Sequence, residues 1–287
     1  MKNLLRKVLT SGMATDEADL FNATKLVFEC LDQGTSTAGW LSTMALHAGD
    51  ALPADVAAIG VDTNILKVLR RAPLMTDNLL SYVEDHGIPL IIPGQSAHEY
   101  WNNHGAIVRD IEGIYSGVET LKKKILALNV SDEQVHAVQE IELHIERLAT
   151  EMHDSRRPEL LKESVAFWEN VMPKARVCNV SRLAFKELAE VRFATKTAPG
   201  FADTKKISQA LGDFFVWADF LLGLALSGLG SSTKHQQRVV FVTDDDKPDW
   251  KASGKPHPVL ASELFRLTGH HLQIMGSKEF ERTITPT

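Results

Sequence analysis

Acidic residues stand in four short segments that lie far apart in the chain. The segments are VDTNIL at 61–66, PGQSAHE at 93–99, LGDFFVW at 211–217 and VFVTDDDKPDW at 240–250. Carboxylate oxygens of this kind hold hard divalent cations such as Mg²⁺ and Mn²⁺. A cation held in this way can activate a water molecule and neutralise charge on a phosphodiester during hydrolysis. The four segments therefore predict a metal-dependent nuclease.

Short, continuously apolar runs come directly before two of these acidic groups. VAAIGV at 56–61 precedes Asp62, and RVVFVT at 238–243 precedes Asp244. Such runs are typical of buried parallel strands. Further runs of this kind lie at 88–93, 175–180 and 272–275. Because ligands gather at the carboxyl ends of the strands in open parallel sheets, we expect the two acidic groups at one edge of a sheet.

Helical patterns alternate with the apolar runs, which predicts an α/β fold with a central parallel sheet flanked by helices. These patterns lie at roughly 64–71, 75–86, 95–126, 181–194, 205–228 and 258–268. Residues 1–55 are also mostly helical in pattern, and nothing in them indicates a role. Ser131 and Gln134 have the spacing of a capping box, and apolar residues then recur at helical intervals. We expect 110–172 to be a helical insertion in a nuclease domain that spans 56–287.

The net charge of −6 is unevenly distributed along a chain of 287 residues whose composition is that of an ordinary globular protein. Residues 110–172 contain 7 basic and 13 acidic side chains, whereas 173–287 contain 16 basic and 12 acidic ones. The basic excess of the C-terminal part predicts a rim that contacts phosphate. Its candidate members include Lys205, Lys206 and Lys247. A solvated surface is the structural alternative for each of these lysines.

The two cysteines, Cys30 and Cys178, lie in unrelated stretches and suggest neither a disulfide framework nor a zinc site. A reducing compartment fits this usage best. The N-terminus lacks the uninterrupted apolar core of a signal peptide. No apolar run approaches the ~20 residues that a membrane helix needs. We therefore expect a cytoplasmic protein that has no membrane partner.

Each acidic position also has a structural alternative to metal binding. Asp62 suits the cap of the helix that follows it, and Ser96 with Glu99 has capping-box spacing. Asp213 lies in an otherwise apolar helix, where an unpaired carboxylate is costly, so a metal or a cationic partner is favoured there. The run 244–246 suits an Asx-type turn, yet three adjacent carboxylates repel one another unless a positive charge lies nearby. A cation is the simplest way to balance the run.

Three motifs resemble one branch of the PIN-like nuclease family. They are PGFADTKK at 199–206, GDFFVW at 212–217 and VTDDDKPDW at 242–250. The branch pattern runs P-G-x-x-D, then G-D-x-x-x-W, then V-T-x-D-x-K-x-D-W. VDTNIL is similar to the first-strand motif of the wider family. The resemblance covers roughly 56–109 and 175–280, and a long helical insertion between these parts is usual in the branch.

This resemblance implies a Rossmann-like PIN fold, a tendency to form dimers and Mg²⁺- or Mn²⁺-dependent hydrolysis of RNA. Single-stranded DNA is the alternative substrate. The positions that match catalytic, metal-binding acids are Asp62, Glu99, Asp213 and Asp245. Supporting positions are Asn64, Thr243, Asp203, Asp244 and Asp249. Phosphate contacts are expected from Lys205, Lys206 and Lys247. Where a basic residue is expected soon after Glu99, the chain has Asn102, Asn103 and His104.

Three other functions share parts of this pattern. A haloacid-type phosphatase needs a second aspartate where this chain has Asn64. A structure-specific DNA nuclease shares the carboxylate chemistry, but the sequence has no helix-hairpin-helix glycine pattern. The non-enzymatic alternative is a catalytically silent PIN-like module that binds RNA or a protein through 1–55 or 110–172.

Overall fold

The computed structural model describes most of the chain. The described residues are 16–33, 56–103, 117, 120, 123–124, 132–202, 207–229 and 237–285. The chain divides into two compact units, one of Met1–Tyr100 with Glu169–Thr287 and the other of Trp101–Trp168. The candidate site belongs to the first unit. Three of its predicted residues, Asp203, Lys205 and Lys206, lie outside the described residues.

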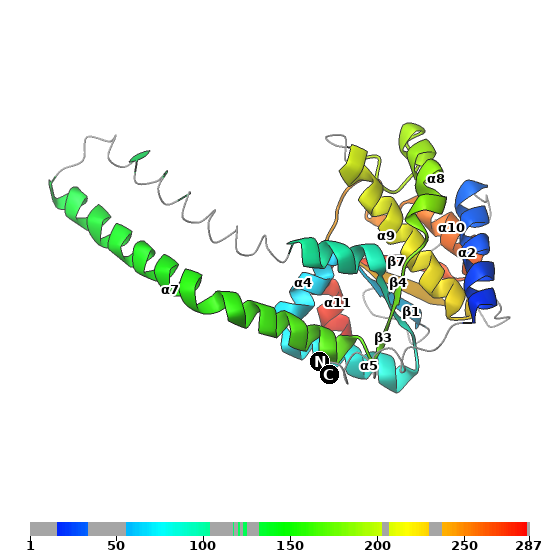
Figure 1. Ribbon diagram of the computed structural model, residues 1–287, viewed down its shortest axis with the longest axis horizontal. Coiled ribbons are helices and arrows are strands. Elements are labelled where there is room, and N and C mark those ends of the chain that lie inside the picture. Colours follow the sequence, from blue (N-terminus) through cyan, green and yellow to red (C-terminus); the bar gives the residue numbers. More distant parts are fainter. Residues whose placement is uncertain are drawn as a thin grey trace. The chain divides into compact units, whose positions relative to one another are not determined.

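The first unit is built on a five-stranded parallel sheet (Figure 1). Its strands are β1 (Val56–Val61), β2 (Leu90–Pro93), β3 (Ala175–Cys178), β4 (Arg238–Val242) and β7 (His271–Met275). They lie in the order β3-β2-β1-β4-β7, so the chain changes direction across the sheet between β1 and β4. In such sheets this switch point is where ligands bind. Asp62 follows β1 and Thr243 follows β4, which places both at the switch point.

Four helices cover one face of the sheet (Figure 1). They are α2 (Glu17–Asp32), α8 (Arg182–Ala194), α9 (Ile207–Leu226) and α10 (Pro258–Thr268). The mostly apolar α9 buries Trp217 and Phe220 completely, and the Phe220 ring lies 4.9 Å from that of Phe241 in β4. A Cβ atom at Gly60 in β1 would clash with the Phe220 ring, so this glycine lets the helix pack closely on the strand.

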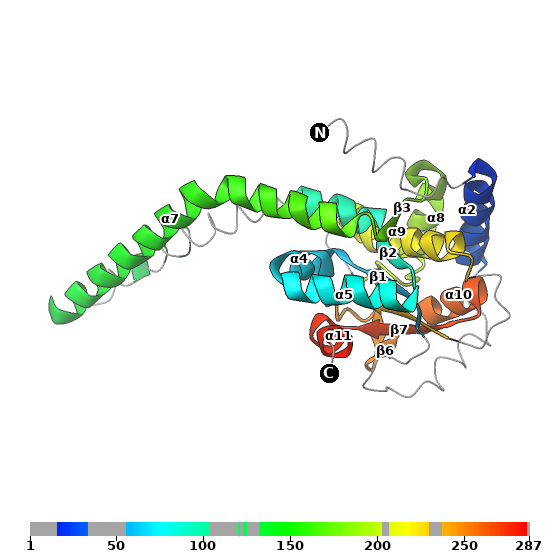
Figure 2. The same cartoon turned by 90° about the horizontal axis from the view of Figure 1, so that it is seen from below.

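Helices α4 (Thr63–Arg71), α5 (Pro73–His86) and α11 (Ser277–Ile284) lie on the other face (Figure 2). Pro73 stands in the first turn of α5, where its missing N–H is not needed. Gly87 ends this helix with a φ of 63°, a left-handed conformation that suits glycine. Because helices cover both faces, every side chain of β1 and β2 is buried, which explains their continuously apolar sequences.

A buried aspartate on α9 joins three elements of the frame. The carboxylate of Asp219 accepts two hydrogen bonds from the Arg182 guanidinium, at 2.8 and 2.7 Å. It also accepts the backbone N–H groups of Gln95 at 2.8 Å and Val180 at 2.7 Å. Since these donors follow β2 and β3, Asp219 holds the ends of two strands against the helix.

A second buried acid joins the helices themselves. Glu263 on α10 pairs with Arg192 on α8 at 2.6 Å and accepts the indole N–H of Trp217 at 2.8 Å. The same guanidinium donates to the carbonyl of Leu31 at the end of α2, at 2.9 Å. Buried charges are tolerated when they are paired in this way. This pair therefore fixes four helices on one face of the sheet.

The second unit contains most of α7 (Asp132–Val171), a helix of 40 residues. Within it, the rings of Trp101 and Trp168 stack with centroids 6.3 Å apart. Helical structure in α7 agrees with the pattern of apolar residues in the sequence. The unit starts earlier than the insertion expected at 110–172, and residues 104–116 are outside the described part.

Some elements differ from the sequence-based expectation. The strand expected at 175–180 ends at Cys178, because the Val180 N–H binds Asp219 and no longer joins the sheet. The hairpin of β5 (Lys251–Ala252) and β6 (Lys255–Pro256) was not predicted, although its turn residue Gly254 is a typical signal for one. Helix α11 was also missed.

Both cysteines are buried free thiols. Burial raises the pKa of Cys30 and of Cys178 to about 12 in each case. Within the described residues, none of the helices combines the length and apolar character that crossing a membrane demands.

Candidate functional site

Asp62 stands between the end of β1 and the start of α4. Its Oδ1 accepts the Thr63 N–H at 2.5 Å and the Ser96 hydroxyl at 3.3 Å. Its Oδ2 accepts hydrogen bonds from Asn64 Nδ2 at 3.0 Å and from the Thr243 hydroxyl at 2.9 Å. The side chain therefore caps α4, as one interpretation of the sequence predicted, and it also faces the switch point of the sheet.

The hydrogen-bond partners of the Asp62 carboxyl do not offset the cost of burying its negative charge. Burial raises its pKa, and the charges of Glu99 and Asp245 raise it further. Hydrogen bonds from Thr63 and Thr243 lower the pKa, but the net direction is upward. A positive ion beside Asp62 would offset this unfavourable burial of charge.

Thr63 forms hydrogen bonds with both Asp62 and Glu99 and so holds the two acids near each other. The Thr63 hydroxyl donates to Glu99 Oε2 at 2.9 Å, and Gln95 Nε2 donates to Oε1 at 2.9 Å. The helix that carries Glu99 begins at residue 94, and the Ser96 hydroxyl binds Asp62. The capping-box interpretation of Ser96 and Glu99 is therefore wrong.

Gly212 lets α9 pass close to Glu99. A Cβ atom at this position would lie 2.9 Å from Glu99 Oε1. Because Asp213 comes next in the helix, the glycine also brings that aspartate to the same place. The charges of Asp62 and Asp245 both raise the pKa of Asp213, which shows that these acids lie close together.

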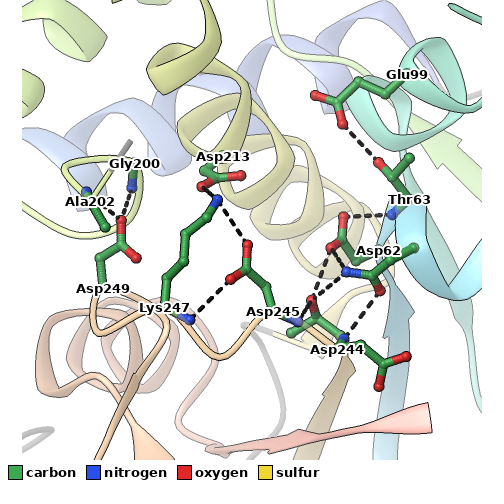
Figure 3. Close-up of polar contacts among 12 residues, drawn as sticks. Asp62, Thr63, Glu99, Gly200, Ala202, Asp213, Asp244, Asp245, Lys247 and Asp249 are labelled. Carbon is green, nitrogen blue, oxygen red and sulfur yellow. Dashed lines mark hydrogen bonds and ion pairs between the residues drawn. The ribbon is translucent and has the colours of Figure 1, made fainter. Parts of the chain in front are cut away.

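The three consecutive aspartates after β4 point to different partners. Asp244 accepts the N–H of Ser277 at 2.7 Å and so caps the start of α11. Asp246 is exposed and pairs with Lys251 at 3.1 Å. Asp245 turns toward Asp213 (Figure 3). The like charges are thus separated, and one of the three remains in the site.

Lys247 lies between two of the predicted metal ligands (Figure 3). Its ammonium is 3.1 Å from Asp213 Oδ2 and 2.9 Å from Asp245 Oδ2. Its backbone N–H donates to Asp245 Oδ1 at 3.0 Å. The cationic partner that the apolar surroundings of Asp213 called for is therefore present in the chain itself.

Asp213 is poised to exchange a proton near neutral pH. Burial raises the pKa of its carboxyl to about 7, although the ion pair and hydrogen bond with Lys247 lower it. The charges of Asp62 and Asp245 act in the same direction as burial. A group with such a pKa can take up and release protons during catalysis.

Asp249 holds the loop that leads into the predicted phosphate-contacting lysines. Its Oδ2 accepts the backbone N–H groups of Gly200 at 2.8 Å and Ala202 at 3.0 Å. Its Oδ1 is buried and has no hydrogen-bond partner among the residues that the structure describes. The neighbouring Trp250 stacks on Phe241 with ring centroids 5.3 Å apart, which anchors Asp249 in the core.

The donors at the switch point fit a hard divalent cation by their chemistry. All are oxygen atoms, and burial raises the pKa of Asp62 and Asp213, so a cation beside them would favour their charged forms. The Lys247 ammonium already takes a cation's place beside two of them. In the described ranges, however, no three His, Cys, Asp or Glu side chains form a group that could hold an ion.

Four residues of the site were not singled out from the sequence as contributors. Thr63, Gln95, Ser96 and Gly212 all lie within the acidic segments. The spacing of four residues between Gln95 and Glu99 places them on one side of a helix, so that pair could have been recognised. The bond from Ser96 to Asp62 joins separate elements, and no local spacing reveals it.

The parallel sheet, its helices on both faces and the acids at the switch point define a Rossmann-like α/β protein. A family model described as a PIN-like domain matches residues 119–262, half of the chain. The chain therefore belongs to the PIN-like domain family, whose members are generally nucleases. The match includes Asp213 and Asp245 and starts after Asp62 and Glu99. No curated protein and no solved structure matches the chain.

Proposed function

We propose that this protein is a metal-dependent ribonuclease. The observation that carries the proposal is the convergence of Asp62, Asp213 and Asp245 at the switch point. The Lys247 ammonium pairs with both Asp213 and Asp245, and the charges of Asp62 and Asp245 raise the pKa of Asp213. Membership of a family of nucleases supports hydrolysis of a phosphodiester. The branch motifs and the basic C-terminal part support RNA as the substrate.

In the proposed reaction, some residues of the site would bind the metal ion and others would orient those ligands. Asp62, Glu99 and Asp245 would hold Mg²⁺ or Mn²⁺, while Asn64 and Thr243 keep the Asp62 carboxylate in one orientation. When bound, the ion would lower the pKa of a water molecule and neutralise charge on the phosphate.

Asp213 would accept the proton of the attacking water, since the pKa of its carboxyl is about 7. Direct attack on phosphorus needs no covalent intermediate. Lys205 and Lys206 would bind the phosphates on either side of the cleaved bond. Asp249 fixes the backbone of Gly200 and Ala202, which come shortly before these lysines in the sequence.

The test is a cleavage assay with Mg²⁺ or Mn²⁺ on single-stranded RNA, structured RNA and single-stranded DNA. Asp62→Asn and Asp245→Asn are each expected to lower the cleavage rate by about a thousandfold, since each removes charge from the ion's position. The matched control is Asp246→Asn, because Asp246 is adjacent in sequence but exposed and paired with Lys251. Wild-type rates in both site variants would refute the proposed site.

A catalytically silent PIN-like module that binds RNA is the second candidate. It is favoured by the lack, in the part of the chain that the structure describes, of a group of acids that could hold an ion. This function predicts RNA binding without cleavage in either metal. It also predicts that Mn²⁺ leaves the melting temperature unchanged, because only a ligand of the native state raises it.

A further inference from the structure

The two sides of the acidic site differ in how their charge is balanced. Within the described residues, every partner of Asp62 and Glu99 is a neutral donor. On the other side, Asp213 and Asp245 share the ammonium of Lys247. Among the residues that the structure describes, one side of the site thus has no cationic partner, and the other side already contains one.

The backbone of Lys247 belongs to an anchored turn, so its side chain starts from a fixed point beside Asp213 and Asp245. Its backbone carbonyl accepts the N–H groups of Trp250 at 3.0 Å and Lys251 at 3.1 Å, which closes the turn after Asp245. Trp250 is buried against Phe241, so the turn is anchored in the core. The Lys247 side chain is 31% exposed, which leaves it partly accessible to a substrate.

Hydrolysis of a phosphodiester can use two cations about 4 Å apart, one at the attacking oxygen and one at the leaving oxygen. An ammonium held by two carboxylates can supply positive charge at one of these positions, although it cannot polarise water as a metal does. It also repels a metal ion that approaches the same carboxylates. A lysine at this position therefore limits how many ions the site takes.

We propose that Lys247 takes the place of a second metal ion, so that the site binds a single divalent ion on the Asp62 side. This inference rests on the proposed function. Asp245 would serve both cations, because its Oδ2 binds Lys247 and its charge also acts on Asp62. Asp213 then pairs with Lys247, does not bind the metal ion and can act as the proton acceptor.

The inference is tested by titrating the full chain with Mn²⁺ in a calorimeter and measuring stoichiometry and affinity without RNA. The wild type is expected to bind one Mn²⁺ per chain. Lys247→Met keeps the length of the side chain and removes its charge. It is expected to bind a second Mn²⁺, or to bind the first about tenfold more tightly, because a nearby repulsive charge is gone.

Further variants separate the effect of the Lys247 charge from that of its shape and its turn. Lys247→Arg keeps the positive charge and is expected to bind one ion. Lys247→Gln also removes the charge, and it serves as the test if the Met variant does not fold. Lys251→Met is the matched control, because Lys251 lies in the same turn but pairs with the exposed Asp246. It is expected to bind Mn²⁺ as the wild type does.

Two ions per chain in the wild type, or a Met variant that binds Mn²⁺ with unchanged stoichiometry and affinity, would overturn the role of Lys247. If RNA is still cleaved in those cases, the proposed nuclease function stands. Failure of every variant to bind Mn²⁺, together with no cleavage of RNA, would overturn both.

Discussion

Two aspartates on α9, Asp213 and Asp219, differ in how completely they are paired. Asp219 is fully buried and accepts two bonds from Arg182 and two from backbone N–H groups. Asp213 is 21% exposed and shares the single ammonium of Lys247 with Asp245. The first carboxylate has all the partners that a buried charge requires, and the second does not.

This difference separates a residue that holds the fold from one that is available for chemistry. Complete pairing leaves Asp219 nothing to offer a ligand, and it fixes the ends of β2 and β3. Burial raises the pKa of both carboxyls, but only Asp213, whose pKa is about 7, has a partly exposed side chain that can exchange protons or pair with a cation. Burial alone would not distinguish the two acids.

The largest effect is expected on catalysis when Asp213 is changed to Asn. Single-turnover cleavage of RNA at saturating Mn²⁺ should slow by about a thousandfold, within the range that a positioned proton acceptor contributes. The folded state should remain intact, as judged by circular dichroism. Cleavage at the wild-type rate would show that Asp213 takes no part in the reaction.

A loss of stability is expected instead when Asp219 is changed to Asn. The free energy of unfolding, measured in urea, should fall by about 3 kcal/mol, because one member of a largely buried ion pair is left unpaired. This figure is at the low end because Arg182 is 37% exposed. Glu84→Gln, which removes the exposed ion pair with Lys174, is the control and should leave stability unchanged. Equal stability in the Asp219 variant and the wild type would contradict the assigned role.

The stability of the metal-free protein should depend on pH through Asp213. Its pKa rises from 3.8 in the unfolded chain to about 7 in the fold, so the native state retains a proton that the unfolded state loses. Stability from this group is therefore full below about pH 4, falls as the pH rises to about 7 and is then constant. The fall should be about 2 kcal/mol, roughly half the full value of the shift because the group is partly exposed.

This dependence is measured by urea unfolding in a chelator at about pH 5 and about pH 8, comparing the wild type with Asp213→Asn. The variant should lose less stability than the wild type between these two conditions. The same slope in both proteins would mean that Asp213 titrates equally in the folded and unfolded chains.

The smallest effect is expected from Gly212→Ala. Alanine is favoured over glycine inside a helix, so the free energy of unfolding should rise by about 0.5 kcal/mol. The new methyl group would press on Glu99 Oε1, and Mn²⁺ affinity should fall severalfold. Gly223→Ala is the contrast, since its methyl group would clash with Ile91 in the core and lower stability. Unchanged Mn²⁺ affinity in the Gly212 variant would show that Glu99 does not contribute to binding of the ion.

The architecture and the placement of Asp62 and Asp245 could be predicted because both depend on local signals. Continuous apolar runs indicate buried parallel strands, and residues that directly follow such strands meet at one edge of the sheet. The pairing of Asp219 with Arg182 could not be predicted in this way. The two residues are 37 positions apart on different helices, and only the packing of α8 on α9 brings them together.

The role of Glu99 shows a second limit of local patterns. Ser96 and Glu99 fit a capping box by spacing. In the fold, however, the Ser96 hydroxyl donates to Asp62, which follows β1. Which acceptor a donor binds depends on the geometry of the folded chain. The spacing of residues in the sequence does not reveal that geometry. Lys247 was likewise recognised as a residue of the site, but its bonds to Asp213 and Asp245 became apparent only in the folded arrangement.

The buried cysteines have a practical consequence for all these measurements. Thiols with a pKa of about 12 are almost entirely protonated at neutral pH, and the protonated form reacts very slowly with maleimides and methanethiosulfonates. A new cysteine on the exposed surface of α8, for example at Leu183, could therefore be labelled selectively in the otherwise native chain. A spin label there would report its distance to bound Mn²⁺, and labels at several such positions would locate the ion.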